Sequence, residues 1–444
     1  MVFLHGIVPR LNLPVHTSLV IIYIAVFTPI LVLLYFELAN RRFAARTPKG
    51  CRKLGLYSTN SNLDDEHEYN LHGTRGAATA TTKEKTPNKP RIKALVAYPL
   101  KSCKGIEFNI ADFVGTGLAF DRQFCFAEYI DSRLPADNTK EGGNPAGRWD
   151  ARTLRDGKYS KLALIRPEIW VPDPASSAYS SKLPAVRSKG VLVIHYPRLT
   201  DSRLVKLGMK LGLVDDEDSF QVPLYPPENL SPSSSKYTLT PLRMFHNSLF
   251  ALDYGHHVPA SLAQFLESKK PLSLFRAPVT VADQRVLIGG NVPSETDLGF
   301  KPITNFPDEY PLQVQNLASI RDIAARTKYA IPRLTVRRFR PNIVLEGLEA
   351  YTEDSWRKIR FFPTYVASTD TGTGYRKLDA EEARGGVDVH VPCRTVRCRL
   401  PNVDPDTGER HPVEPDKTLR TVRCIDPGNE KSGCLGMMLL PTTQ

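Results

Sequence analysis

The segment V-P-C-R-T-V-R-C-R-L-P-N-V-D-P-D-T-G, residues Val391 to Gly408, holds two cysteines among arginines and short apolar runs. A second segment, F-R-P-N-I-V at Phe339 to Val344, also places a cation and an amide beside apolar residues. Arg397 directly precedes Cys398, and a neighbouring cation favours the thiolate form of a cysteine, which binds soft metals. Together the two segments predict a site for an anionic, sulfur-binding cofactor.

The size and composition of the chain are those of a large globular protein. Its 444 residues suffice for two domains with extensions, and a 41% hydrophobic content is ordinary for a chain with a core. The 59 basic residues exceed the 47 acidic ones by 12, which favours partners such as nucleic acid, anionic lipid, acidic proteins or phosphorylated ligands. Because no dense Lys/Arg run with interleaved aromatic residues is present, we expect no nucleic-acid partner. Seven scattered cysteines argue against a secreted disulfide scaffold and favour a reducing compartment.

A hydrophobic segment near the N-terminus, residues 18–38, is long enough to cross a membrane. It carries no charge before Glu37, and about 20 apolar residues span the hydrocarbon layer as a helix. We therefore predict a single transmembrane anchor after a short segment, residues 1–17. A cleaved signal peptide is the alternative, but its apolar region would be unusually long. Only Arg10 precedes the span, whereas six basic residues follow it closely: Arg41, Arg42, Arg46, Lys49, Arg52 and Lys53. This asymmetry predicts that the main body faces the cytosol.

The rest of the chain divides by composition into a linker and two folded parts. Residues 39–90 are polar with little apolar periodicity, so we predict a disordered basic tether. Alternating apolar residues then begin a β-rich N-terminal domain, residues 91–278, which carries Ser/Pro-rich insertions. Residues 279–444 form the second predicted domain. The predicted fold class is α+β and rich in β-structure.

A few segments carry local signals of helix or strand. Leu262, Phe265 and Leu266 share one face of a short amphipathic helix predicted over residues 259–268. Residues 314–327 have helical spacing of their apolar positions, and residues 339–345 predict a buried strand. Elements of both kinds therefore surround the two arginine-bearing segments.

Several classes of site are disfavoured by the motifs. No Walker-type loop, G-x-G-x-x-G fingerprint or H-E-x-x-H is present, which argues against nucleotide kinases, Rossmann enzymes and zincins. Cys393 and Cys398 are separated by four residues, unlike a zinc C-x-x-C pair, so a structural zinc is not expected. A nucleophilic pair of a cysteine with His390 or His411 remains an alternative, and surface histidines are the simpler interpretation.

Three further cations occur in turns or at strand ends, namely Lys101, Arg122 and Arg340. Each alone is most simply a solvated charge. As a set that converges on one thiolate, they would suit a metal cofactor that bears a phosphate.

Ordered motifs from residue 92 to the C-terminus resemble the MOSC family, and specifically its membrane-anchored amidoxime-reducing molybdoenzymes. The motifs that carry the resemblance are Y-P-L-K-S-C-K-G at 98–105, F-D-R at 120–122, F-R-P-N-I-V at 339–344, E-D-S-W at 353–356, and R-C followed by V-D-P-D-T-G between 397 and 408. The resemblance implies a β-barrel-like MOSC domain after a β-rich MOSC N-terminal domain.

The resemblance also implies roles for individual residues. Cys398 is the expected catalytic thiolate ligand of molybdenum in a molybdenum–molybdopterin cofactor. The expected contacts to the cofactor's phosphate and pterin are Lys101, Ser102, Arg122, Arg340, Asn342 and Arg397. The implied activity is reduction of small N-hydroxylated or N-oxygenated substrates. Electrons would come from NADH through a flavoprotein reductase and a b-type haem carrier. The implied location is the mitochondrial outer membrane, although the endoplasmic reticulum fits the anchor equally well.

The chain departs from the family pattern at three places. The segment from Cys393 to Cys398 is two residues longer than the family's C-x-x-C. Glu309 and Tyr310 replace small hydroxyl residues, and the closing strand motif V-G-D-x-V is missing, so we expect the last barrel strand to be absent or replaced.

Two other functions stay open. The first is a non-catalytic carrier of molybdenum cofactor or sulfur, because MOSC-like domains also occur fused to sulfurases that bind pyridoxal phosphate. No pyridoxal-phosphate-dependent desulfurase domain is visible in this chain, which disfavours the fused version. The second is a membrane-bound interaction protein with a degenerate site.

Overall fold

The computed structural model describes residues 15–67, 90–131, 147–227, 236–245, 247–280, 284–287, 292–367, 375–379, 381 and 385–442. The chain divides into two compact units, one made of residues 1–49 with 201–215 and the other of residues 50–200 with 216–444. We describe each unit by itself.

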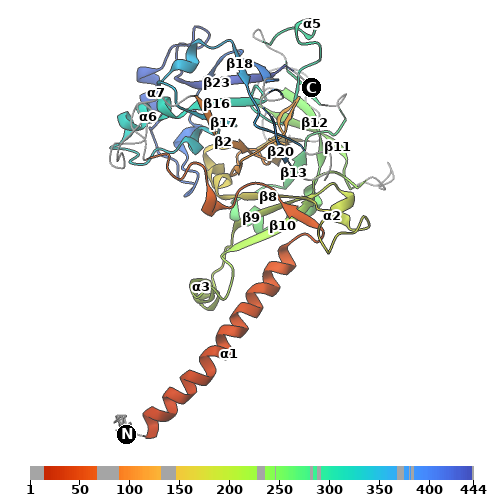
Figure 1. Cartoon of the computed structure of the whole chain (residues 1–444), viewed down its shortest axis with the longest axis vertical. Helices are drawn as coiled ribbons and strands as arrows, with labels where there is room; N and C mark the ends of the chain where they lie inside the picture. Colours follow the sequence, from red (N-terminus) through yellow and green to blue (C-terminus); the bar gives the residue numbers. More distant parts are fainter. Residues whose placement is uncertain are drawn as a thin grey trace, which may run out of the picture. The chain divides into compact units, whose positions relative to one another are not determined.

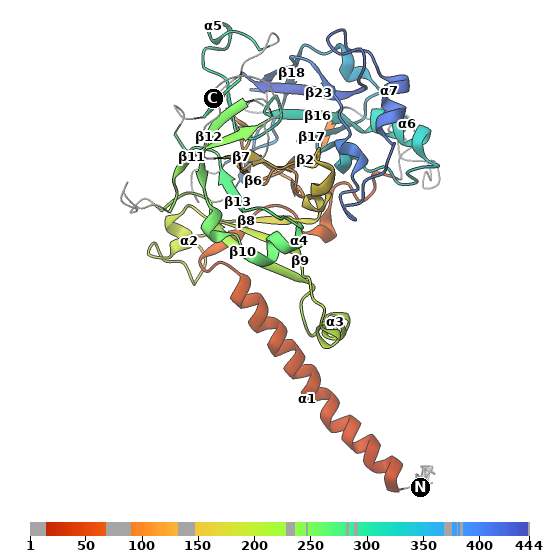
Figure 2. The same ribbon diagram turned by 180° about the vertical axis from the view of Figure 1, so that it is seen from behind.

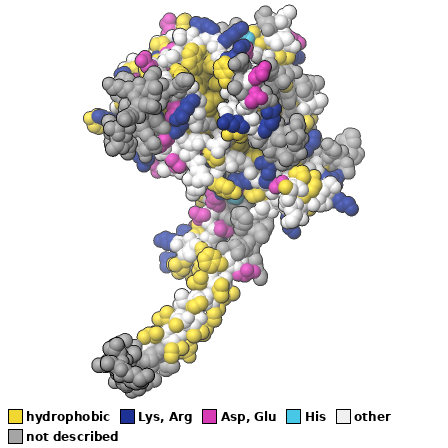
Figure 3. All heavy atoms as spheres, viewed as in Figure 1, with side chains coloured by type: hydrophobic (Ala, Val, Ile, Leu, Met, Phe, Trp, Pro, Cys, Tyr) yellow, Lys and Arg dark blue, Asp and Glu magenta, His cyan; other side chains and the backbone are white. Residues whose placement is uncertain are grey.

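The first unit contains the long N-terminal helix α1 (Val15–Arg46) and the short helix α3 (Arg203–Lys210). Within α1, residues Val20–Glu37 have a mean hydropathy of 2.3, and none of this window is buried inside the protein. Hydrophobic side chains cover most of the visible face of α1 (Figure 3). By length and composition this helix is a candidate membrane span, which agrees with the predicted anchor.

The second unit is built mainly from an antiparallel sheet, a larger mixed sheet and a barrel (Figures 1 and 2). The first sheet has the order β1 (Cys51–Lys53), β8 (Arg166–Pro172), β9 (Val191–Pro197) and β10 (Glu217–Pro223). The closed barrel follows the order β11 (Leu239–Met244), β12 (Asn247–Asp253), β13 (Leu272–Arg276), β6 (Phe124–Ile130) and β7 (Arg148–Ala151). Strand β9 reads V-L-V-I-H-Y-P and is buried along almost its whole length, as expected for a strand covered on both faces.

The largest sheet has eight strands and contains most strands of residues 301–440. Its order is β18 (Lys358–Phe361), β21 (Val387–His390), β23 (Cys434–Pro441), β16 (Leu312–Asn316), β17 (Ile343–Glu346), β2 (Arg91–Ala97) and β3 (Ile106–Phe108), while β22 (Arg394–Val396) pairs with β23. Strands β2 and β3 precede the predicted domain boundary after residue 278, yet they complete this sheet. The final segment forms β23, an eight-residue strand with β16 and β21 as neighbours, where we expected the last strand to be absent or replaced.

The β-rich α+β class is confirmed, and the structure includes a closed barrel. Its strands all fall between residues 124 and 276, in the predicted N-terminal domain. Three two-stranded pairs complete the described β-structure: β4 (Phe113–Val114) with β5 (Gly117–Leu118), β14 (Arg285–Val286) with β15 (Ile303–Thr304), and β19 (Tyr365–Ala367) with β20 (Tyr375–Lys377).

The remaining helices are short. They are α2 (Pro184–Arg187), α4 (Ala260–Phe265), α5 (Glu295–Leu298), α6 (Leu317–Thr327) and α7 (Asp416–Val422), with 3-10 turns η1 (Ser58–Asn60), η3 (Gly157–Leu164), η4 (Gly255–His257), η6 (Val336–Phe339), η7 (Thr352–Ser355) and η9 (Leu400–Asn402). The predicted amphipathic helix at 259–268 corresponds to α4, which buries Leu262 and Phe265.

Helix α6 connects the parallel strands β16 and β17, which need such a crossover. The Asn316 side chain accepts a hydrogen bond from the Ala318 N–H (3.0 Å) and so caps the helix start. The predicted helix over 314–327 is therefore wrong for residues 314–316, which belong to β16.

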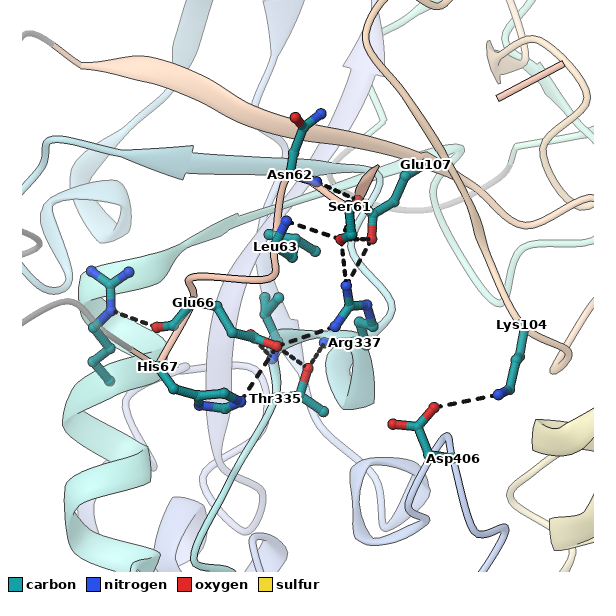
Figure 4. Close-up of polar contacts among 12 residues, drawn as sticks. Ser61, Asn62, Leu63, Glu66, His67, Lys104, Glu107, Thr335, Arg337 and Asp406 are labelled. Atoms are coloured by element: carbon teal, nitrogen blue, oxygen red, sulfur yellow. Dashed lines mark hydrogen bonds and ion pairs between the residues drawn. The ribbon is translucent and has the colours of Figure 1, made fainter. Parts of the chain in front are cut away.

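Residues 58–67, which we call the strap, pack against the rest of the second unit instead of forming part of a disordered tether. Leu63 is only 1% exposed and joins the apolar cluster that includes Leu317 and Ile320 of α6. The Glu66 carboxylate accepts hydrogen bonds from the Thr335 hydroxyl (2.5 Å) and the Val336 N–H (2.9 Å) (Figure 4). The tether prediction is wrong for residues 51–67, since β1 and the strap are ordered there; residues 68–89 lie outside the described residues.

Candidate functional site

Three of the predicted cofactor contacts have a left-handed backbone conformation that is uncommon for residues other than glycine. The φ angles are 71° at Ser102, 47° at Arg122 and 54° at Arg340. Only five other non-glycine residues in the described part of the chain share a positive φ. Arg340 ends η6, and the other two residues lie in turns before β3 and β6. Such conformations cluster at functional sites, where surrounding contacts hold them in place.

All seven predicted site residues line one cavity of about 100 Å³. They come from four segments far apart in the sequence: Lys101 and Ser102, Arg122, Arg340 and Asn342, and Arg397 and Cys398. Cys398 lies in this wall, but Cys393, His390 and His411 do not belong to it. Of the two cysteines of the opening segment, only Cys398 lines this cavity, and neither histidine of the alternative cysteine–histidine pair does. The roles of the seven residues remain predictions.

An ion-pair cluster forms one side of the cavity. The Lys101 ammonium is buried, donates a hydrogen bond to the Phe306 carbonyl oxygen (2.7 Å) and forms a close ion pair with Asp308. Arg155 holds the other oxygen of the Asp308 carboxylate at 2.7 Å. Burial by itself would raise the pKa of Asp308, but Lys101 and Arg155 lower it well below its usual range. The pKa of Lys101 is lowered by burial against the opposing attraction of Asp308.

Two arginines stack around one tyrosine on another side of the site. The guanidinium carbons of Arg340 and Arg122 lie 4.2 and 5.0 Å from the centre of the Tyr98 ring. Burial raises the pKa of Tyr98 to about 12, although both cations oppose the shift. Arg122 donates hydrogen bonds to Asp121 (2.5 Å) and to the Asn342 side-chain oxygen (3.1 Å). Asn342 in turn donates to the Val96 carbonyl oxygen (3.1 Å), which fixes the strand β2 beside this group.

Arg340 keeps part of its hydrogen-bonding capacity free for a ligand. Its Nη1 donates to the Cys103 carbonyl oxygen (2.6 Å), whereas its buried Nη2 has no hydrogen-bond partner. Burial lowers the pKa of Arg340, and the neighbouring Arg122 adds to this effect. A buried donor without a partner is costly, so an anion at this nitrogen would be stabilising.

Arg397 differs from the other cations because its guanidinium donates its hydrogen bonds to backbone carbonyl oxygens. Its Nε and Nη2 donate to the Leu435 carbonyl oxygen (3.0 and 2.8 Å), and its Nη1 donates to the Phe339 carbonyl oxygen (3.0 Å). The side chain therefore links β23 to the end of η6, next to Arg340. This geometry supports a positioning role for Arg397 more than the predicted direct contact with a cofactor.

Sequence reasoning missed several residues of the cavity wall. Arg155, Asp308 and Thr395 were not predicted, and Glu309 and Tyr310 were noted only as departures from the family pattern. Arg155 belongs to no recognisable motif, so no signal in the sequence could have identified it. Asp308 sits beside the unusual Glu309–Tyr310 pair, which was the one available hint.

The donor set fits a molybdenum cofactor bearing a phosphate. The cavity offers one cysteine thiol and several buried cations, and two buried donors lack partners, Arg340 Nη2 and the Thr395 hydroxyl. A volume of about 100 Å³ is small for such a group, because cofactor-sized pockets are typically about 300–1,000 Å³. A second cavity of about 450 Å³ shares Arg340 and Leu400 with the first, so it lies next to it. Figure 4 shows Lys104, Glu107, Arg337 and Asp406 from its wall.

Comparison with known proteins shows which families the chain resembles. Residues 301–440 match the MOSC domain family. The chain is 30% identical over 196 residues to mitochondrial amidoxime-reducing component 1 of Danio rerio, covering 44% of this chain and 50% of the relative. It is 29% identical over 126 residues to mitochondrial amidoxime reducing component 2 of Homo sapiens, covering 28% and 30%. The matched part thus spans about half or less of these relatives. They give no support to pyridoxal phosphate binding. Residues 301–440 are therefore similar to MOSC domains, and part of the chain is similar to the amidoxime-reducing components.

Proposed function

We propose that this protein is a membrane-anchored molybdenum-cofactor oxidoreductase that reduces N-hydroxylated or N-oxygenated compounds. The observation that carries the proposal is the convergence of Cys398 with several cations in one cavity, where Arg340 Nη2 has no hydrogen-bond partner. The similarity to amidoxime-reducing components supports the same class of reaction.

We assign a separate role in holding the cofactor to each of these residues. Cys398 would ligate the metal through its thiolate. Arg340, Arg122 and Lys101 would hold the phosphate, with Arg340 Nη2 as the donor that is free in the structure. Arg397 would keep β23 and the end of η6 in register, so that Cys398 and Arg340 stay aligned. When bound, molybdenum supplies the two-electron redox chemistry.

Reduction of an N-hydroxylated compound consumes two electrons and two protons, breaks the N–O bond and releases water. We assign the proton supply to Glu309, which lines the cavity and is partly exposed to solvent; desolvation and the neighbouring Asp308 charge raise its pKa. We assign the electron supply to a b-type haem carrier fed by an NADH-dependent flavoprotein reductase. The protein would be anchored by α1 in the mitochondrial outer membrane or the endoplasmic reticulum, with its main body in the cytosol.

The test is metal and pterin analysis of the full chain expressed in a host that makes molybdopterin. We expect molybdenum and pterin in the unmutated protein, loss of molybdenum and activity in Cys398→Ala, and weaker cofactor retention in Arg340→Ala. Arg357→Ala removes an exposed arginine of the same domain and serves as the matched control. Circular dichroism would verify that every variant is folded.

Turnover separates an enzyme from a carrier. With reduced viologen as electron donor and an amidoxime as substrate, an enzyme forms the amidine. Transfer of cofactor to an acceptor apoprotein without turnover would instead support the carrier function. A folded, unmutated protein that contains neither molybdenum nor pterin would refute the proposal. An unchanged molybdenum content in Cys398→Ala would refute the ligand assignment alone.

A further inference from the structure

The segment that connects β9 to β10 carries an unusual set of exposed leucines. Helix α3 begins after Ser202, whose hydroxyl accepts a hydrogen bond from the Val205 N–H (3.4 Å). The exposed fractions are 80% for Leu204, 52% for Leu207, 59% for Leu211 and 44% for Leu213. At about 100° per residue, the first three leucines lie within roughly 60° of one another around the helix. A face of this kind normally lies against another apolar surface.

Basic residues flank and oppose the leucines on the same helix. Arg203, Lys206 and Lys210 are all exposed, and no acidic residue occurs from residue 202 to residue 214. Lys206 points roughly 160° away from Leu204 on a helical projection. A short helix with leucines on one face and Lys/Arg beside and behind them is typical of segments that lie in the headgroup layer of a membrane.

The position of this segment relative to α1 indicates how deep it would lie in the membrane. Residues 201–215 and α1 belong to the same compact unit, and both views place α3 beside α1 (Figures 1 and 2). A methyl group added at Gly212 would lie 3.2 Å from the Tyr35 hydroxyl oxygen. Tyr35 precedes the end of the apolar window at Glu37 by two residues, which is about 3 Å along a helix. Tyrosine at the end of a membrane span commonly marks the lipid–water interface.

We propose that residues 203–213 form a second membrane contact, in which the leucines enter the outer acyl region and the three basic side chains bind anionic lipid headgroups. This inference rests on the proposed membrane anchoring by α1. A protein partner could also cover the leucines, but it would not account for their coincidence with the end of the apolar span or for the basic residues that surround them.

Tryptophan quenching in vesicles tests the lipid contact on the full chain. Leu204→Trp places the probe on the apolar face, and Lys206→Trp is the matched control on the opposite face of the same helix. The vesicles contain phosphatidylcholine brominated near the headgroup end of its acyl chains, with about one-fifth phosphatidylserine. Relative to the unmutated protein, we expect the added tryptophan emission of Leu204→Trp to be quenched at least about twofold more than that of Lys206→Trp. Equal quenching of the two variants would overturn the proposed contact.

A second comparison tests the role of charge. In the Leu204→Trp background, Lys206→Glu combined with Lys210→Glu should remove the dependence of quenching on phosphatidylserine, because opposite charges no longer attract the segment. Persistence of that dependence would refute the headgroup contact. Vesicle flotation separates these outcomes from failure of the anchor. A chain that does not float with vesicles refutes anchoring by α1, whereas one that floats without quenching at position 204 refutes only the second contact.

Discussion

Removal of the Glu66 carboxylate should release the strap from the second unit. Glu66 is 4% exposed and receives hydrogen bonds from the Thr335 hydroxyl (2.5 Å), the Val336 N–H (2.9 Å) and Arg337 Nη1 (3.4 Å). Hydrogen bonds to a charged acceptor contribute about 1.5–3 kcal/mol each, and those sharing one carboxylate are not additive. For Glu66→Ala we therefore expect the strap to lose about 2–3 kcal/mol of local stability.

Hydrogen exchange measures this loss directly, because the strap is an edge segment that can open without global unfolding. A loss of 2–3 kcal/mol corresponds to roughly 30- to 140-fold faster exchange. The Glu66 amide, which donates to the Leu63 carbonyl oxygen (3.1 Å), and the Val336 amide are the reporters. Glu66→Gln keeps one acceptor oxygen and should accelerate exchange less.

The matched control is Glu295→Ala, which removes an exposed glutamate from α5. Exchange in the strap that is no faster in Glu66→Ala than in this control would refute the reasoning. Because Thr335 and Val336 begin the turn that ends at Arg340, we also expect Glu66→Ala to retain less cofactor than the control.

Three further predictions concern pH and backbone geometry. The pKa of Asp308 is lowered in the folded state, so its carboxylate stabilises the fold above its ordinary pKa of 3.8 and this stabilisation is lost as the pH falls further. In urea denaturation at a series of pH values, the free energy of unfolding of Asp308→Asn should therefore decline less steeply below pH 3.8. The pKa of His257 is lowered to about 4 by burial, with His256 adding to the effect, so the free energy of unfolding should fall as the pH drops from 6.5 to 4. His257→Gln, which keeps a hydrogen-bonding group near Tyr237, should flatten that decline, and an unchanged slope would contradict the assignment. Gly436 has φ 79°, and a Cβ added there would lie 2.5 Å from the Val314 carbonyl oxygen. Gly436→Ala should therefore lower the free energy of unfolding by more than about 2 kcal/mol in urea denaturation, and a smaller loss would show that β23 can shift.

Local patterns determined those parts of the structure that depend on near neighbours in the chain. The uncharged run before Glu37 leads to a long apolar helix, and the spacing of Leu262 and Phe265 identifies α4. The cations and the thiol of the site were also visible in the sequence, because their motifs lie in short contiguous stretches. Each of these signals is carried by residues within about one or two turns of one another.

Patterns of this kind failed where long-range contacts outweigh local preference. The strap is polar and looked disordered, but Leu63 gains an apolar cluster and Glu66 gains buried donors that lie about 270 residues away in sequence. Residues 314–316 have helical spacing, yet pairing with β17 and β23 on either side makes them part of β16. Tertiary contacts supplied the hydrogen-bond partners in both cases.

The sequence by itself determined which chemical groups this protein has for a cofactor, because a thiol beside an arginine and several cations in turns are fixed by residue identity. Only the tertiary structure decided how they are used. In the structure Arg340 Nη2 has no hydrogen-bond partner, whereas Arg397 donates its hydrogen bonds to backbone carbonyl oxygens. Arg155 and Asp308 also line the cavity, although neither belongs to a recognisable motif. The physical reason is that hydrogen-bond satisfaction depends on which segments meet in space, and the segments that form this cavity are up to about 300 residues apart.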